Sequence, residues 1–391
     1  MLTESRSIRE EEKMRFLHLS DLHLGKRVHG FSMIEDQAHA LRQIEEIARS
    51  TGPDAVLIAG DLYDKGVPPT EAVSLLDGFL TRLLSLKIPV LATSGNHDSP
   101  ERLSFGGNIL DASGLYIAGM LQSEVKRVRL MDAWGPVDFY LLPFVKSAKA
   151  AALRPQTAIE NCDDAVRAML AGMPREAGVR RVLLAHQLVA APGEQVERCD
   201  SETLQLGGTD AVLVDAFDAF DYVALGHLHR AQRVGRDGVR YAGSPLKYSF
   251  SEARGAKSVT LVEMNAKSVH AELLPLSPLR EMRELRGRLS ELLEAAQGGS
   301  DDYVRAVLTD EEPLYDAIGR LRRVYPNVMS LEFEREAALQ TREALHQVDV
   351  RSRTPMELFE DFYFHQAGLE LDDAARAVVQ DAVSRAQEGQ A

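Results

Sequence analysis

Aspartate, histidine and asparagine side chains recur at five places in the sequence, each directly after a short apolar run. The five places are Asp21-x-His23, Gly60-Asp61, Gly95-Asn96-His97-Asp98, His186 and Gly226-His227-x-His229. Carboxylates, imidazoles and amide oxygens are ligands for divalent metal ions, and an imidazole that is not a ligand can carry a proton. The pattern therefore predicts a site that combines metal binding with acid–base chemistry.

Taken singly, each of these motifs has an ordinary structural explanation. A Gly-Asp pair after a strand is usually a turn, Asn96 is a turn-forming residue type, and an isolated His186 is more often a hydrogen-bonded interior histidine. Their joint occurrence, always after an apolar run, favours a shared site. The predicted ligands are Asp21, His23, Asp61, Asn96, His186, His227 and His229.

The chemistry of this ligand set favours two metal ions over one. Mixed carboxylate, imidazole and amide ligands suit Mn²⁺ or Fe²⁺, suit zinc less specifically, and suit Mg²⁺ or Ca²⁺ poorly because those ions prefer oxygen ligands. The set exceeds what one ion accepts once water and substrate also bind. Two ions ~3.5–4 Å apart, bridged by one carboxylate, clamp the attacking and leaving oxygens of phosphoryl substitution.

The elements that would position these residues are the strands of an α/β protein. Apolar strands are predicted at 15–20, 54–60, 89–93, 181–185 and 222–226, with further strands at 239–243 and 258–263. Helices are predicted at about 32–50, with Ser32 as N-cap, and from 70 to about 86. Strands alternating with helices indicate a largely parallel sheet, and ligands bind at the carboxyl ends of such strands. We expect two packed sheets flanked by helices.

The length of 391 residues predicts two or three domains. The predicted division is a disordered leader at 1–13, with Met14 as a candidate natural start, a main domain at 14–275, a small α/β domain at 276–335, a linker at 336–353 and C-terminal helices at 354–391. In the small domain we expect helices at about 280–296 and 313–323, and strands at 303–309 and 328–333. The first tail helix is rich in aromatic residues, which indicates docking on its own domain or on a partner.

Charge and composition limit the possible functions. A formal net charge of −14 argues against a protein that grips nucleic acid by bulk positive charge, but it leaves room for an enzyme that handles phosphates through bound metal ions. No apolar run approaches the ~20 residues of a membrane span. The two cysteines form no CxxC pair, which argues against a zinc–thiolate site and indicates a reducing cytoplasm.

As a set, the motifs resemble those of the calcineurin-like metallophosphoesterase superfamily. The longer strings FLHLSDLHLGK, GDLYDKGVPP, SGNHDSPERLSFG, LGHLHRAQ and AGSPLKYSFSE are similar to the nuclease subunits of bacterial SbcCD complexes. The resemblance spans about residues 14–365. It implies an α/β fold in which a two-sheet β-sandwich is flanked by helices, followed by a small α/β capping domain and C-terminal helices.

The resemblance also implies roles for individual residues. One ion would be held by Asp21, His23, Asp61 and His229, and a second by Asp61, Asn96, His186 and His227. His97 would be the catalytic histidine that is not a ligand and that protonates the leaving oxygen or stabilises the transition state, and Asp98 would orient His97. The implied cofactors are two divalent metal ions, with Mn²⁺ favoured. Some relatives carry a histidine at the position of Asp64, so this residue is given no role.

The implied function is that of a DNA nuclease in the cytoplasm, at the nucleoid, with 3′–5′ double-strand exonuclease and single-strand and hairpin endonuclease activity in repair, recombination and replication. The implied partner is an SbcC-like, SMC-type ATPase that binds the C-terminal helices, and a homodimer is compatible with the family. Local DNA contacts are predicted for Lys26, Arg27, Arg102 and Lys247, each of which could equally be an ordinary solvated charge.

Two alternatives are kept. One is a small-molecule phosphodiesterase or phosphatase of the same superfamily, and the other is a non-catalytic subunit that tethers DNA ends. The extra C-terminal architecture argues against the first. The presence of every ligand position and of His97 argues against the second.

Overall fold

The computed structural model describes residues 13–202, 211–296, 298–312 and 314–334, and some residues between 354 and 380. The chain forms two compact units, Met1–Arg283 and Glu284–Ala391, and this division lies close to the predicted boundary at 275. The predicted linker and, apart from Lys13, the predicted leader lie outside the described residues, as does most of the predicted helical tail.

The first sheet of the larger unit has six strands and is mostly parallel. In spatial order these are β16 (Val269–Leu276), β15 (Lys257–Met264), β1 (Met14–Leu19), β4 (Ala55–Ala59), β5 (Val90–Thr93) and β6 (Leu115–Ala118). The last four run parallel to one another, whereas β15 is antiparallel to both of its neighbours. The carboxyl ends of β1, β4 and β5 therefore meet at one end of the sheet.

The second sheet also has six strands, with a parallel centre. Its order is β13 (Gln232–Val234), β14 (Arg236–Tyr241), β12 (Tyr222–Gly226), β9 (Arg180–His186), β8 (Gly135–Leu142) and β7 (Lys126–Asp132). Only the outer strands β13 and β7 pair in antiparallel fashion. The described part of this unit also contains two short strand pairs: β2 (Arg27–Val28) with β3 (Phe31–Ser32), and β10 (Val189–Ala190) with β11 (Val212–Leu213).

The two sheets pack face to face around one apolar layer. Phe16 of β1 meets Phe139 of β8 and Tyr222 of β12, with ring centroids 5.6 and 5.5 Å apart. Along β4, Leu57 points into this layer while the next residue, Ile58, packs toward the helices on the outer face. Because such strands are buried on both faces, they appear in the sequence as unbroken apolar runs.

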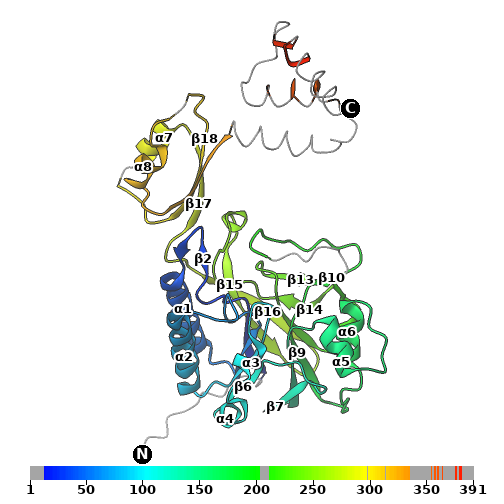
Figure 1. The fold of residues 1–391 in the computed structure, drawn as a ribbon. Coiled ribbons are helices and arrows are strands. Elements are labelled where there is room, and N and C mark those ends of the chain that lie inside the picture. Colours follow the sequence, from blue (N-terminus) through cyan, green and yellow to red (C-terminus); the bar gives the residue numbers. More distant parts are fainter. Residues whose placement is uncertain are drawn as a thin grey trace, which may run out of the picture. The chain divides into compact units, whose positions relative to one another are not determined.

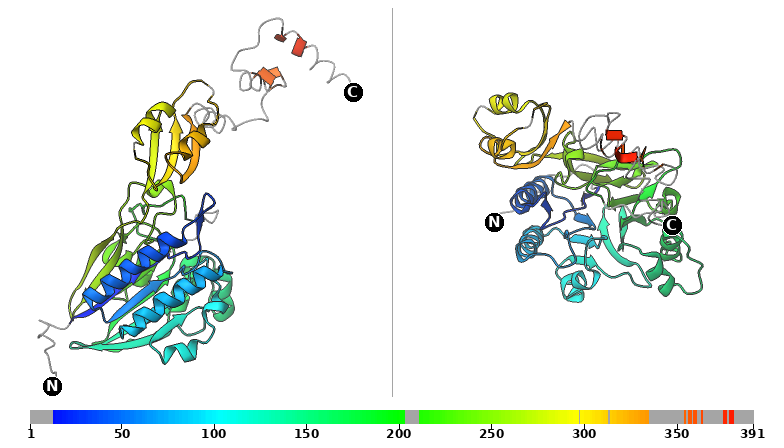
Figure 2. Two further views of the ribbon diagram at one scale, coloured as in Figure 1. Left: turned by 90° about the vertical axis from the view of Figure 1, so that its left-hand side faces the viewer. Right: turned by 45° about the horizontal axis from the view of Figure 1, so that its top comes forward.

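Helices cover the outer face of each sheet, giving the order helix, sheet, sheet, helix (Figures 1 and 2). The first sheet is covered by α1 (Ile34–Thr51) and α2 (Thr70–Ser85), and the second by α5 (Ser147–Leu153) and α6 (Cys162–Leu170). The shorter helices are α3 (Pro100–Leu103), α4 (Gly107–Asp111), η1 (Val214–Phe217) and η2 (Phe250–Glu252). The predicted two-sheet α/β sandwich is confirmed.

The start of helix α1 differs from the sequence expectation. Helix α1 begins after Met33, which makes no side-chain cap, whereas the predicted cap Ser32 pairs with Arg27 in the β2–β3 hairpin.

His18 is fully buried between the sheets, where its ring nitrogens bond the Tyr222 hydroxyl and the Leu225 carbonyl. Burial lowers the pKa of His18 to about 3, so it is a neutral core residue.

The smaller unit is built on a three-stranded sheet in the order β17 (Met282–Gly287), β18 (Tyr303–Leu308) and β19 (Val328–Phe333). Helices α7 (Leu289–Ala295) and α8 (Ala317–Arg322) share an apolar core with this sheet. The predicted helix at about 280–296 is wrong in its first half, because that stretch is strand β17. Pairing with β18 overrides the helical spacing of Met282 and Leu285. None of the described helices in either unit is long and apolar enough to cross a membrane.

Candidate metal centre

The predicted ligands all lie where strands of the two sheets end. Asp21 and His23 follow β1, Asp61 follows β4 and Asn96 follows β5 in the first sheet. His186 ends β9, and His227 and His229 follow β12, in the second sheet. Because the sheets pack face to face with these ends together, residues up to 206 positions apart in sequence come within hydrogen-bond distance.

Asp61 lies at the centre of this group. Its Oδ2 is 3.3 Å from Nε2 of His186 and 3.6 Å from Nε2 of His23. Its Oδ1 accepts a hydrogen bond from the backbone N–H of His97 at 2.9 Å. One carboxylate therefore faces a histidine from each half of the predicted site, as a bridging ligand must.

The other ligands pair around Asp61. Nε2 of His23 lies 3.2 Å from Nε2 of His229, and Oδ1 of Asn96 lies 3.0 Å from Nε2 of His186 and 3.1 Å from Nδ1 of His227. Both carboxylate oxygens of Asp21 accept the backbone N–H of His227 at 3.1 Å. Among the residues that the structure describes, three overlapping groups have potential ligand atoms within 4.8 Å of one another: Asp21, His23 and His229; Asp21, Asp61 and His186; and His23, Asp61 and His97.

The backbone at these positions is strained. Asp21, His23 and Asp61 have left-handed φ angles of 54, 43 and 50°, and His227 has a φ of 108°. Such conformations cost about 1–3 kcal/mol each and persist where the surrounding structure enforces them, which is frequent at functional sites. The chain turns sharply after each strand, and each turn directs a polar side chain into the same space.

Two glycines allow the ligands to approach the backbone so closely. A Cβ on Gly95 would lie 2.1 Å from Oδ1 of Asp61, and a Cβ on Gly60 would lie 2.3 Å from Nδ1 of His186. Both distances are far shorter than a van der Waals contact. The glycines of the Gly-Asp and Gly-Asn motifs are therefore required by the packing of the ligands.

The hydrogen bonds of His186 indicate that this space is suited to a cation. Its Nδ1 donates to the Ala59 carbonyl at 2.9 Å, which in a neutral ring leaves Nε2 without a proton. Nε2 then faces only acceptors, the Asn96 oxygen and the Asp61 carboxylate. Burial alone would lower the pKa of His186, but Asp61 raises it to about 9. The surroundings of Nε2 thus favour a positive charge, and the ligand set fits a divalent cation.

His97 lies beside the predicted ligands His23 and Asp61, and one of its ring nitrogens is bound to the backbone. Its Nδ1 lies 3.0 Å from the backbone oxygen of Asp64, to which it can only donate, so Nε2 is the atom left for proton transfer. The ring packs edge-on against the ring of His23, with centroids 4.8 Å apart. The carboxylate of Asp64 binds Lys26 at 2.6 Å and lies 3.6 Å from Nδ1 of His23.

Asp98 joins the loop after β5 to the loop after β4. Its carboxylate accepts the backbone N–H groups of Leu62, Tyr63 and Gly95 at 2.9–3.1 Å. Burial and the charge of Asp61 raise the pKa of Asp98 to about 7, while the three backbone donors oppose this shift. Asp98 therefore supports the backbone that carries Asn96 and His97. Its predicted role of orienting His97 stays a prediction, and these contacts favour an effect through the backbone.

Two residues outside the predicted site, Gln37 and Tyr248, support the loop that carries His23. Gln37, buried in α1, donates to the backbone oxygens of Leu22 and His23 and accepts the N–H of Gly25. The Tyr248 hydroxyl also donates to Leu22 at 2.6 Å. Together they hold the loop that carries His23. Tyr248 lies in one of the strings that carry the resemblance, whereas a glutamine on a helix has no distinguishing spacing.

The four residues predicted to contact DNA differ in their availability. Lys26 is paired with Asp64, and Lys247 with Glu281. The side chains of both lysines are largely buried, with exposed fractions of 14% and 10%. Arg27, in β2, and Arg102, in α3, are both exposed. The two arginines are thus the more accessible cations, and contact with DNA stays a prediction for all four.

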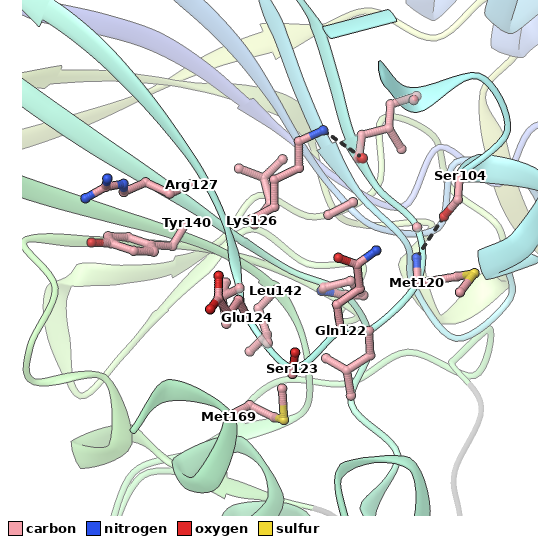
Figure 3. Close-up of a pocket in the computed structure, with 18 of the residues that line it drawn as sticks. Ser104, Met120, Gln122, Ser123, Glu124, Lys126, Arg127, Tyr140, Leu142 and Met169 are labelled. Atoms are coloured by element: carbon pink, nitrogen blue, oxygen red, sulfur yellow. Dashed lines mark hydrogen bonds between the residues drawn. The ribbon is translucent and has the colours of Figure 1, made fainter. Parts of the chain in front are cut away.

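A cavity of about 940 Å³ lies elsewhere in the larger unit and contains none of the predicted ligands. Figure 3 shows its lining, in which Lys126 is paired with Asp111 and Ser104 accepts the N–H of Met120. These polar groups are thus partnered by the walls of the cavity itself. The cluster of acids and histidines at the strand ends, not this cavity, is the candidate functional site.

Comparison with known families gives two matches along the chain. Residues 14–231 match the family described as calcineurin-like phosphoesterase. Residues 278–367 match the family described as type 5 capsule protein repressor C-terminal domain. The first match contains every strand end that carries a predicted ligand, from Asp21 to His229.

Similar proteins include the SbcD subunit of the nuclease SbcCD from Staphylococcus epidermidis, which is 30% identical over 357 residues, covering 90% of this chain and 92% of that protein. Among solved structures, a dimetal phosphatase from Danio rerio has a TM-score of 0.40 and 11% identity, covering 68% of this chain and 98% of that one. The TT1561 protein of Thermus thermophilus has a TM-score of 0.38 and 14% identity, covering 67% and 99%.

Proposed function

The chain belongs to the calcineurin-like phosphoesterase family and, within it, to the SbcD subunits, and from this premise we propose that it is a metal-dependent DNA nuclease. The proposal is carried by two observations that hold for the same chain, one on the site and one on the similarity to known proteins. The strand-end cluster contains groups of acids and histidines that could hold metal ions, and the similarity to an SbcCD nuclease subunit extends over 90% of the chain. The proposed reaction is hydrolysis of DNA phosphodiesters, both as a 3′–5′ exonuclease on duplex ends and as an endonuclease on hairpins and single strands.

Two groups of residues would hold the metal ions. One ion is assigned to Asp21, His23, Asp61 and His229, and the other to Asp61, Asn96, His186 and His227, with Asp61 shared between them. We favour Mn²⁺ because the set mixes nitrogen and oxygen ligands. When bound, the ions supply positive charge that polarises the scissile phosphodiester.

The protein's own contribution to the chemistry centres on His97. With Nδ1 committed to the Asp64 backbone oxygen, Nε2 can hold a proton and deliver it to the departing 3′ oxygen. The backbone N–H of His97 bonds Asp61, so the acid and the shared ligand are held in one fixed relation. Five of the assigned ligands, Asp21, His23, Asp61, His186 and His229, are buried.

The similarity to SbcD subunits also supports proposals for the partners, which are DNA, an ATPase and a second copy of the chain. The smaller unit would guide DNA, with Arg27 and Arg102 as accessible phosphate contacts on the larger unit, and Lys26 and Lys247 as further candidates. The segment 354–391 would bind an SMC-type ATPase, the counterpart of SbcC in an SbcCD complex. The complex would process DNA ends and hairpins in the cytoplasm, at the nucleoid, and two copies of the chain would pair within it.

A nuclease assay tests this function. The full chain, with and without the ATPase and ATP, is incubated with Mn²⁺ and end-labelled hairpin and blunt duplex DNA. We expect cleavage that disappears with EDTA and with His97→Ala. Hydrolysis of bis-p-nitrophenyl phosphate or cyclic nucleotides without any action on DNA would instead indicate a small-molecule phosphodiesterase. DNA binding without hydrolysis of any of these substrates would indicate a tethering subunit.

A further inference from the structure

His229 is held by hydrogen bonds at each of its polar atoms other than Nε2. Its Nδ1 lies 2.8 Å from Oγ of Ser201, and its backbone N–H donates to Oε1 of Glu202 at 2.8 Å. Its backbone oxygen accepts from Nζ of Lys257 at 2.8 Å and from the N–H of Ser244 at 3.1 Å. Only Nε2, which faces His23, is directed into the candidate metal centre.

The direction of the Ser201 hydrogen bonds follows from its single proton. The hydroxyl donates to Oε1 of Glu252 at 2.9 Å, because a carboxylate can only accept. Its oxygen must then accept the proton on Nδ1 of His229. With Nδ1 protonated, a neutral ring leaves the lone pair on Nε2.

Glu252 is itself fixed in place. It is 3% exposed, and its Oε1 also accepts the backbone N–H of Tyr248 and the hydroxyl of Ser249, both at 3.1 Å. Its other oxygen binds Lys257, whose side chain is 10% exposed. The buried carboxylate is therefore neutralised by a cation that also contacts His229, and neither charge is left unpaired.

We propose that Ser201, Glu252 and Lys257 form a positioning chain that sets the tautomer and direction of His229 and thereby the affinity of one metal ion. This deepens the proposed function and rests on its metal assignment. Metal-bound histidines commonly donate their second N–H to a carboxylate, and such partners change metal affinity by about 10–100-fold. Here a serine hydroxyl stands between the imidazole and the carboxylate. Ser201 belongs to the segment after β10, which otherwise contributes none of the predicted ligands.

The test is a Mn²⁺ titration of the full chain, stripped of metal, by isothermal titration calorimetry. Ser201→Ala removes the link to Nδ1 and Glu252→Gln removes the charge behind it. We expect each variant to lower the affinity for one of two Mn²⁺ ions by about 10–100-fold and to change the affinity for the other by less than about twofold. Ser201→Thr keeps the hydroxyl and should restore most of the affinity.

The control is Ser147→Ala, which removes an equally half-buried serine hydroxyl from α5, and it should bind both ions like the wild type. Thermal unfolding in EDTA checks that each variant is folded. A purely structural network would lower the melting temperature of Ser201→Ala and leave its Mn²⁺ affinities unchanged. That result overturns the positioning chain.

DNA cleavage separates this proposal from the proposed function. For Ser201→Ala, we expect cleavage to require more Mn²⁺ and to recover at saturating Mn²⁺, because the ligands themselves remain. A wild type that binds two Mn²⁺ ions but cleaves no DNA would overturn the proposed nuclease function. The Mn²⁺ affinities of the variants would still test the positioning chain. A wild type that binds no Mn²⁺ would overturn both.

Discussion

The backbone oxygen of Asp64 lies 3.0 Å from Nδ1 of His97. Because a carbonyl oxygen can only accept a hydrogen bond, Nδ1 carries a proton in both the neutral and the charged ring. Asp64 and His97 come from the loops after β4 and β5, and Asp98 joins the same two loops through backbone N–H groups. The backbone N–H of His97 also bonds Asp61, so the proposed general acid and the proposed shared ligand are held by the same two loops. The proposed roles of proton donor and metal ligand thus fall on neighbouring residues, His97 and Asn96.

Replacing His97 by alanine should stop cleavage without removing the metal ions. Loss of a general acid typically costs about 10²–10⁴-fold in rate. Cleavage of hairpin DNA and Mn²⁺ binding by calorimetry are measured on the same preparation. Release of an ion together with the loss of cleavage would show that His97 is a ligand, in agreement with its closeness to His23 and Asp61.

Replacing Asn96 by alanine should have the opposite pattern. Its Oδ1 is shared between His186 and His227, so its removal takes a neutral oxygen from one ion only. We expect one of two Mn²⁺ binding events to weaken, with cleavage partly restored by raising Mn²⁺. Equal weakening of both ions would place Asn96 between them and contradict the assignment.

Gly95→Ala tests the close approach of Asp61 to the backbone. A Cβ there would lie 2.1 Å from the carboxylate, so the loop must shift, at a cost of about 1–3 kcal/mol or more. We expect lower stability in urea unfolding and loss of Mn²⁺ binding. Gly107→Ala, where the added Cβ meets nothing within 4 Å, is the matched control and should leave both properties unchanged.

The clustering of the predicted ligands could be predicted from the sequence because buried strands appear in it as continuous apolar runs. Val56 to Ile58 of β4 are fully buried on both faces, so the strand appears as a continuous apolar run that ends at the polar Asp61 motif. The same relation holds for the run before Asn96. Strands of this kind end together at one side of a sheet, which brings their following residues together.

The supporting contacts could not be predicted because they depend on loop geometry and on distant pairing. Ser201 and His229 are 28 positions apart and share no motif spacing. The bonds of Asp98 go to backbone N–H groups, which every residue except proline offers. The strand β17 was mistaken for a helix because its place is set by its neighbour β18 and not by its own residues.

Cys199 should be nearly unreactive at neutral pH. Burial, followed by the charges of Glu252 and Glu202, raises the pKa of its thiol to about 12. The thiolate is the reactive form, so at pH 8 alkylation should be roughly 10³-fold slower than for an ordinary thiol, and the rate should rise as pH increases toward 12. Iodoacetamide kinetics on Cys162→Ser, in which Cys199 is the sole thiol, measure this. An ordinary rate in the folded chain would contradict it, whereas an ordinary rate is expected in denaturant.

Gln37→Ala should weaken both the fold and the metal centre. The side chain bonds the backbone of Gly25 and His23 and the hydroxyl of Tyr248, all within the buried loop that carries His23 or packed against it. Its removal leaves buried donors and acceptors without partners, at a cost of about 1–3 kcal/mol for each group. We expect a loss of about 2–4 kcal/mol in urea unfolding and weaker binding of the ion assigned to His23.

Gln43→Ala provides the matched control for this last prediction. Gln43 lies on the same helix and also makes two hydrogen bonds, with the backbone of Ser277, but at an exposed position where water can replace the amide. Its loss should cost less than about 1 kcal/mol and leave Mn²⁺ binding unchanged. Equal destabilisation by the two variants would mean that helix α1, and not the buried contact with the His23 loop, sets the effect. In that case Gln37 would have no particular part in holding the metal centre.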